Sequence, residues 1–213
     1  IAIAILLNRR LRGRSALRVL IFVPYVLSEV IAGLSWRLLL QPNGPFDGVM
    51  AAIGLGEARQ LWLADTNVVL FTVFGIITWK YVGFAIILFL AGLQGIPDEI
   101  TEAAQIDGAS WWQTQRHITV PLLGPTIRIW AFLSIIGSLQ LFDLVWIVTG
   151  GGPANATTTM ATYMVQFGFQ RSQLGFGSAV AVILFIISLA FALVYQRFVL
   201  RRDLEGSLTR RVG

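Results

Sequence analysis

The chain has 213 residues, of which 56% are apolar and only 13% are charged, and its formal net charge is +5. Soluble domains carry roughly 25% charged residues, so this composition indicates a protein whose solvent is lipid. The lack of cysteine excludes disulfides, thiolate metal sites and cysteine nucleophiles, and the single histidine, His117, makes a histidine-built metal site implausible. The basic residues flank apolar stretches and form no basic surface interleaved with aromatic residues, which argues against nucleic-acid binding.

An apolar run over Ile1–Leu7 opens the sequence and leads directly into Asn8-Arg9-Arg10. A signal peptide places its positive charges before the apolar stretch, so we interpret this run as the end of a spanning helix. We therefore expect the chain to be incomplete at its N-terminus, with at least one further helix upstream.

Four complete spans are predicted after this run, because each apolar stretch exceeds the roughly 20 residues that cross a hydrocarbon core. They cover Leu17–Leu40, Asn67–Leu93, Leu122–Val148 and Leu174–Val199. The expected fold is all-α, a polytopic bundle of transmembrane helices. Positive flanks favour the cytoplasmic side, so both ends are expected inside. The arginines that indicate this orientation are Arg9, Arg10, Arg12, Arg14, Arg18, Arg197, Arg201, Arg202, Arg210 and Arg211.

The segments that connect the spans then alternate between the two sides of the membrane. Gln41–Thr66 and Thr149–Gln173 are expected outside, and Gly95–Pro121 is expected inside. The first outer segment begins with several turn-forming residues. Asp47 follows them and is expected to cap a short interfacial helix that runs to Ile53.

The inner loop shows the most detailed local pattern. A proline and two acidic residues open a predicted helix over Asp98–Asp107, where the helix dipole favours negative charge, and Gly108 supplies a left-handed stop. Ser110 and Gln113 have the spacing of a capping box, which predicts a second short helix. Pro121 is expected to open the next span. Two short helices should therefore meet at Gly108.

This loop resembles the EAA loop of ABC importer permeases. The string Glu102-Ala103-Ala104, three residues, Gly108, nine residues and Ile118-Thr119-Val120-Pro121 has the spacing of that motif. It departs from the family pattern at Gln115, where an aromatic residue is usual, and at Val120, where leucine is usual. The alternative is an ordinary amphipathic hairpin, but the full string favours a docking role. The resemblance implies that an ATPase couples to Glu102, Ala103, Ala104, Asp107, Gly108 and Pro121, and we call Gly95–Pro121 the coupling loop.

A second motif follows the third complete span. Thr149-Gly150-Gly151-Gly152-Pro153, with Asn155 and Thr157 to Thr159, resembles the signature of the carbohydrate-uptake permeases of the maltose and glycerol-phosphate type. Glycines before a proline permit turns that other residues do not adopt cheaply. The alternative is a flexible outer loop. The resemblance implies a signature loop at Gly150, Gly151, Gly152 and Pro153.

The family resemblance covers nearly the whole chain and implies a single permease domain over residues 1–213. It implies a multi-pass protein of the bacterial or archaeal cytoplasmic membrane, with a sugar as substrate and lipid around it. The expected partners are a second permease, two cytoplasmic ATPase subunits that hold ATP and Mg²⁺, and an external solute-binding protein. The chain itself is expected to bind no cofactor and to catalyse no reaction.

Other function classes fit the sequence less well. An intramembrane enzyme would need a nucleophile and base or a set of metal ligands, and neither H-E-x-x-H nor G-x-S-x-G occurs. The phosphate-binding G-x-x-x-x-G-K-[ST] motif is also missing, so the chain is not itself the ATPase. A permease for another solute class is the closest alternative. A secondary transporter would need no docking loop.

Five charged residues fall within or near the predicted spans, where such residues are costly and usually functional or paired. Arg37 and Arg128 lie close to span ends and are expected to extend toward the interface, whereas Glu29 and Lys80 lie deeper and are expected to be structural partners. The fifth is Asp143.

Asp143 lies on the predicted span that leads into the glycine-rich loop. Gln140 precedes it by three residues and Trp146 follows it by three, so on a continuous helix all three share one face. That face suits a sugar path, because an aromatic ring and polar acceptors are typical of carbohydrate sites. A polar seam against a partner permease is an equal alternative.

Overall fold

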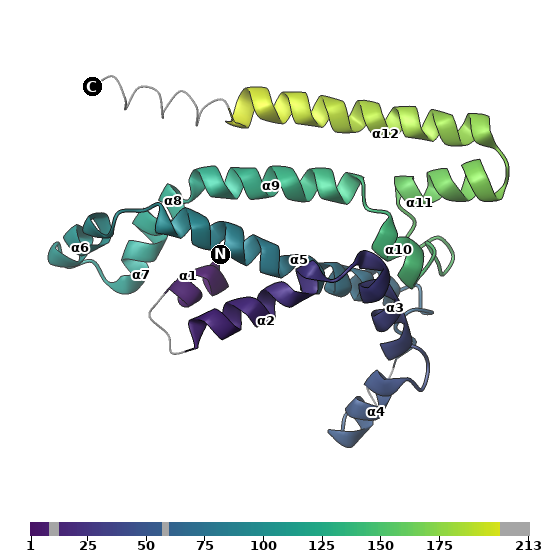
Figure 1. Ribbon diagram of the computed structural model, residues 1–213, viewed down its shortest axis with the longest axis horizontal. Helices are drawn as coiled ribbons and strands as arrows, with labels where there is room; N and C mark the ends of the chain where they lie inside the picture. The colour runs from purple at the N-terminus through teal and green to yellow at the C-terminus, as the bar shows by residue number, and fades with distance from the viewer. Residues whose placement is uncertain (9–12, 57–59, 201–213) are drawn as a thin grey trace. The chain divides into compact units, whose positions relative to one another are not determined.

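The computed structural model describes residues 1–8, 13–56 and 60–200, and every regular element in these ranges is helical (Figure 1). The all-α expectation is confirmed. Seven of the arginines that indicate the predicted orientation lie outside the described residues, namely Arg9, Arg10, Arg12, Arg201, Arg202, Arg210 and Arg211. Helices in chain order are α1 (Ala2–Asn8), α2 (Arg14–Val26), α3 (Glu29–Leu39), α4 (Pro45–Ala52), α5 (Val69–Gln94), α6 (Asp98–Ile106), α7 (Trp111–Thr114), α8 (Val120–Leu122), α9 (Gly124–Leu139), α10 (Asp143–Val148), α11 (Met160–Val165) and α12 (Leu174–Tyr195).

Short π-helical turns continue several of these helices. They cover Gln115–Thr119 between α7 and α8, Gln166–Gln170 after α11, and Gln196–Leu200 after α12. Such turns insert one extra residue per turn and are frequent at functional sites. Because of the first of them, Trp111 to Leu122 forms one helical stretch.

Two helices in the described residues are long and apolar enough to cross a membrane alone, α5 and the stretch Leu174–Val199 that contains α12. They confirm two of the four predicted spans. The predicted span Leu17–Leu40 is instead a broken helix, because α2 and α3 are bent by 94°. A second pair, Trp111–Leu122 and α9, is bent by 62°. The described residues therefore hold up to four spans by length and composition if each bent pair counts as one.

The prediction of a continuous helix over Leu122–Val148 is wrong. Helix α9 ends at Leu139, and α10 begins only at Asp143. Pro121 does not open α9 either, since it lies near the end of the preceding stretch and a turn at Leu123 separates the two. The break before α10 contains neither proline nor glycine, so no local sequence signal marks it.

The contacts divide the chain into two compact units. The first comprises the described residues of Ile1–Phe22, Val82–Ile136 and Ala190–Gly213. A Cβ at Gly83 would lie 2.2 Å from the carbonyl oxygen of Ile21, so α5 and α2 make backbone contact there. The buried core of this unit joins α1, the second half of α5 and the turn before α9, through Ala4, Leu7, Ala85, Ile86, Phe89, Leu90, Leu93 and Leu123.

The second unit comprises Val23–Tyr81 and Gly137–Leu189. Here α3 packs closely on α10, since a Cβ at Gly33 would lie 2.8 Å from Cγ2 of Ile147. Its core combines α3, the first half of α5 and α10, through Ala32, Leu40, Val69, Val73, Ile76, Leu144, Val145 and Val148.

The predicted short outer helix is confirmed as α4, but its cap differs from the prediction. Gly44 occupies the N-cap position, and Asp47 lies in the first turn. The Asp47 carboxylate accepts a hydrogen bond of 3.0 Å from the Asn43 amide, and the side chain is buried. Asp47 therefore ties the preceding turn to the helix.

Candidate coupling loop and polar helix breaks

The coupling loop folds as its local sequence predicts. Helix α6 ends at Ile106, and Gly108 adopts a left-handed φ of +82°. The Ser110 hydroxyl accepts from the Gln113 amide at 3.4 Å, while the Gln113 side chain accepts from the Ser110 amide at 2.7 Å. This reciprocal pair is the predicted capping box. The two short helices meet at Gly108.

The predicted docking residues do not all lie on the same surface. Glu102, Ala103, Asp107 and Gly108 are exposed, but Ala104 is buried at 7% exposure. Ala104 therefore packs inside the loop, whereas Ala103 lies on its exposed side. A small residue there lets α6 approach its neighbours.

Sequence reasoning missed an exposed apolar residue on α6. Ile106 is 87% exposed and follows Glu102 by four residues, so both lie on one face of the helix. Trp112 is also exposed, at 64%. The i, i+4 spacing from Glu102 was the available signal. This face combines one acidic and one apolar side chain.

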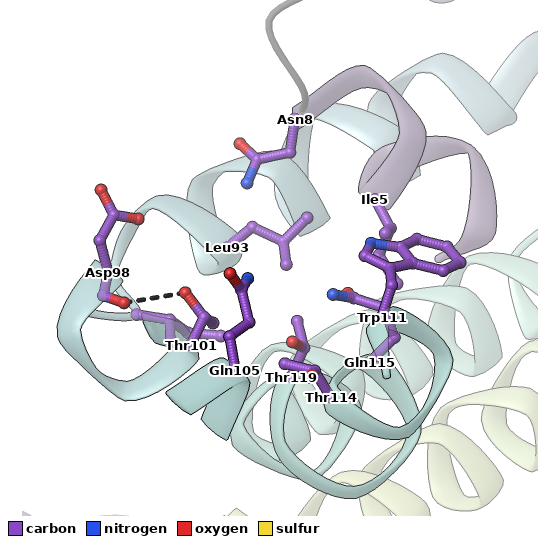
Figure 2. Close-up of a pocket in the computed structure, with 11 residues that line it drawn as sticks. Ile5, Asn8, Leu93, Asp98, Thr101, Gln105, Trp111, Thr114, Gln115 and Thr119 are labelled. Carbon is purple, nitrogen blue, oxygen red and sulfur yellow. Dashed lines mark hydrogen bonds between the residues drawn. The ribbon is translucent and has the colours of Figure 1, made fainter. Parts of the chain in front are cut away.

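A cavity of about 200 Å³ lies between the coupling loop, the end of α5 and α1 (Figure 2). Leu93 of α5 and Gln105, Trp111 and Thr114 of the loop line it, and Figure 2 shows their side chains around the hollow. Thr114 is buried and donates to the Ser110 carbonyl at 3.1 Å. The loop is thus seated against α5 and α1 within the first unit.

Lys80 donates hydrogen bonds to backbone carbonyls at the break between α2 and α3. Its side chain is only 3% exposed, and Nζ donates to the carbonyls of Pro24 at 3.2 Å, Tyr25 at 3.1 Å and Leu27. On the next residue, the Tyr81 hydroxyl donates to the Glu29 carboxylate. Lys80 and Glu29 both have structural hydrogen-bond partners, as expected: Lys80 bonds to carbonyls at the end of α2, and Glu29 at the start of α3 bonds to Tyr81 of α5.

The arginines near the span ends have local partners. Arg37 Nη1 donates to the Ile147 carbonyl at 3.5 Å and its side chain lies beside α10. The guanidinium of Arg128 lies near the start of its own helix, because a Cβ at Gly124 would be 3.2 Å from Arg128 Nη1. The extension of both side chains toward the membrane interface stays a prediction.

The structure removes one of the three residues from the helical face predicted to line the sugar path. Gln140 lies in the break before α10, so it does not share a helical face with Asp143 and Trp146. Asp143 is exposed in the first turn of α10, where the helix dipole favours its charge. The Trp146 ring stacks on Phe142 with centroids 5.4 Å apart. The assignment of these residues to a path stays a prediction.

Hydrogen bonds hold the glycine-rich loop together. The hydroxyls of Thr149 and Thr157 lie 2.7 Å apart, and Thr158 donates to the Gly151 carbonyl at 3.1 Å. Gly150 and Gly151 adopt left-handed φ values of +63° and +91°, and the Gly152-Pro153 bond is cis. The signature glycines thus permit a compact turn that the threonines fix.

Thr159 connects this loop to the break before α10. Its hydroxyl donates to the Leu141 carbonyl at 2.8 Å, which the break leaves without a helical partner. The same oxygen accepts from the Thr162 amide at 3.1 Å and so caps α11. One side chain therefore joins the break to the start of α11.

The comparisons with known proteins agree on one family. The model of the family described as binding-protein-dependent transport system inner membrane component matches residues 1–203. The trehalose/maltose transport system permease protein of Thermococcus litoralis is 34% identical over 198 residues, which cover 92% of this chain and 66% of that protein. A multiple sugar-binding transport system permease protein of Streptococcus mutans is 37% identical over 187 residues, covering 88% of this chain and 64% of that protein.

A solved structure extends the agreement to the fold. It is a bacterial ABC transporter involved in the import of the acidic polysaccharide alginate, with a TM-score of 0.79 and 25% identity, and the match covers 93% of this chain and 71% of that one. The family match over residues 1–203 and the relatives more than 30% identical lead to one conclusion. The chain belongs to the family of binding-protein-dependent transport system inner membrane components, the permease subunits of ABC transporters.

Proposed function

We propose that this chain is the permease subunit of an ATP-driven importer for saccharides. Two relatives more than 30% identical to it are named for trehalose and maltose or for multiple sugars, which supports this substrate class. The glycine-rich loop that follows α10 resembles the signature of the carbohydrate-uptake permeases, which favours the same substrate class. Another solute class for the same architecture is the main alternative.

The coupling loop carries the proposal. Its exposed face presents Glu102 and Ile106, and its inner side is seated against α5 and α1 around the cavity in Figure 2. A basic and apolar groove on an ATPase subunit would match this face. Because the loop packs on α5, a movement of the loop is transmitted to that span.

The transport cycle follows from this arrangement. Two partner ATPases hold ATP and Mg²⁺, and their closure displaces the coupling loops of this chain and of a second permease. The spans then alternate between outward and inward access, while an external binding protein delivers the saccharide. The complex would work in the cytoplasmic membrane of a bacterium or archaeon, with the coupling loop on the inner side.

Charge reversal at Glu102 tests the coupling role. Glu102→Lys places a cation against a basic partner group and should weaken ATPase docking by about 1–3 kcal/mol. Glu102→Gln keeps the size of the side chain and serves as the matched control, with a smaller expected loss. The measurements are co-purification of the ATPase and ATP-dependent uptake of labelled saccharides by the reconstituted complex with its binding protein.

The outcomes separate the alternatives. Wild-type docking and uptake in Glu102→Lys would contradict the coupling role. Binding-protein-dependent uptake of amino acids or peptides, with none of any saccharide, would leave the coupling role intact and overturn the substrate class. Uptake that follows an ion gradient without ATP would indicate a secondary transporter.

A further inference from the structure

The break between α2 and α3 leaves backbone groups without their helical partners. Helix α2 ends at Val26 and α3 begins at Glu29. Pro24 lacks an amide hydrogen, which weakens the last turns of α2. Ser28 caps the new helix by accepting from the Ile31 amide at 3.2 Å. One amide at the break is thus satisfied by a neighbouring side chain, whereas three carbonyls at the break depend on a distant one.

The carbonyl side is satisfied from a distant part of the chain. An ammonium group has three donors, and Lys80 directs bonds to three carbonyls of one break, those of Pro24, Tyr25 and Leu27. Its side chain is 3% exposed, so it does not extend toward an aqueous interface. Unpaired carbonyls at membrane depth cost several kcal/mol each. Lys80 replaces the helical hydrogen bonds that the bend removes.

The adjacent residue acts on the other side of the break. Tyr81 donates its hydroxyl to Glu29, which lies in the first turn of α3. The cation therefore meets the negative end of α2, and the held carboxylate meets the positive end of α3. We call Lys80 and Tyr81 the bend clamp.

The position of α3 has consequences for the candidate path. Gly33 of α3 packs directly against Ile147 of α10, and Asp143 begins α10. The bend clamp, the α3–α10 contact and Asp143 thus form one connected arrangement within the second unit.

We propose that Lys80 is a positioning residue whose ammonium holds the span broken, so that α3 stays packed on α10 beside the translocation path. The claim about the bend stands on the contacts alone. The claim about transport rests on the proposed function.

Distance measurements across the bend test the first claim in the full complex. The chain has no native cysteine, so spin labels can be attached at Val23→Cys and Leu38→Cys, which are 45% and 61% exposed. We expect one narrow distance distribution in the parent. Lys80→Met fills the space without a charge and should broaden the distribution toward the roughly 22 Å of an unbroken helix.

Chemical rescue separates the ammonium from mere packing. Lys80→Ala removes three methylenes and the ammonium, which n-propylammonium matches in size and charge. The amine should restore the narrow distribution in Lys80→Ala, whereas n-propanol should not, and Lys80→Met should not respond to the amine. Lys80→Arg keeps a cation and should assemble with distances close to those of the parent.

Each outcome decides the proposal. A narrow, parent-like distribution in Lys80→Met would overturn it, as would equal loss of order or assembly in Lys80→Met and Lys80→Arg. Assembly of Lys80→Arg but not of Lys80→Met would support it.

ATP-dependent uptake tests the second claim. We expect at least a tenfold loss in Lys80→Ala and recovery with n-propylammonium in parallel with the narrow distances. Restored distances without restored uptake would overturn the link to transport. If the parent complex takes up no saccharide, the proposed function fails, while the distance measurements still decide the clamp.

Discussion

In the coupling loop, every turn is held by residues only a few positions away, whereas the break between α2 and α3 depends on Lys80, up to 56 residues further along the chain. Ser110 and Gln113 cap α7 across three residues, and Gly108 ends α6 by its own backbone conformation. The carbonyls at the α2 break have no such local partner. A loop at the membrane surface can thus be specified by local sequence, whereas a bend at membrane depth needs a tertiary partner for each freed polar group.

The largest expected effect on transport comes from replacing Gly108, whose left-handed backbone conformation ends α6. Gly108→Val must adopt a φ near +82°, which costs about 1–3 kcal/mol in strain or changes the direction of α7. We expect saccharide-stimulated ATP hydrolysis and uptake to fall at least tenfold while membrane insertion persists. No atom lies within 4 Å of an added Cβ there, so the effect is conformational rather than steric.

Two variants control this prediction. Gly48→Val also adds its Cβ to open space but at a residue without a left-handed φ, and it should leave coupling unchanged. Gly108→Asn tolerates the left-handed region and should retain much of the activity. Wild-type coupling in Gly108→Val would mean that the loop only connects two spans.

The same contrast explains which structural features the sequence predicted. Helix α6, the stop at Gly108 and the capping box at Ser110 follow from propensity and side-chain to backbone bonds within a few residues. The apolar runs also predicted α5 and the span to Val199, because hydrophobic length alone decides them. The fold class and these elements therefore needed no tertiary information.

The breaks could not be predicted in the same way. Leu17–Leu40 and Leu122–Val148 are continuously apolar enough to resemble single helices. Pro24 and Ser28 favour the first break locally, but the donors that satisfy the freed carbonyls lie elsewhere, Lys80 for one break and Thr159 for the other. The burial of Ala104 and the exposure of Ile106 are likewise set by how α6 packs. Site residues whose roles depend on such packing, including Gln140, were therefore the least predictable.

A moderate effect is expected at the candidate path on α10. This helix packs against α3, which follows the break bonded by the distant Lys80. Asp143→Asn removes a charge from the first turn of α10, and Trp146→Ala removes a ring that stacks on Phe142. If these side chains contact the saccharide, each loss is worth about 1–3 kcal/mol, so uptake at low substrate should fall several-fold to about a hundredfold. Assembly of the complex should be unchanged.

Gln140→Ala is the matched comparison for this prediction, because Gln140 lies in the break and off the face of α10. A smaller loss in Gln140→Ala than in the other two variants would place the path on α10 itself. Unchanged uptake kinetics in both Asp143→Asn and Trp146→Ala would favour the alternative of a seam against the second permease.

The smallest expected effect concerns the break before α10. A single hydroxyl, that of Thr159, bonds to a freed carbonyl there, whereas Lys80 supplies three donors at the α2–α3 break. Thr159→Val keeps the shape of the side chain but removes the donor to the Leu141 carbonyl and the cap of the Thr162 amide. Losing these bonds should lower the free energy of unfolding by about 1–2 kcal/mol, since a net hydrogen bond contributes about 1 kcal/mol and a helix cap about the same. Thermal unfolding of the detergent-solubilised complex measures this as a lower midpoint. Thr78→Val is the matched control, because the Thr78 hydroxyl bonds to the Phe74 carbonyl of its own helix, a carbonyl that lies inside the regular helix α5. Equal midpoints for Thr159→Val and Thr78→Val would mean that the break before α10 holds without Thr159, and that only the α2–α3 break depends on a distant donor.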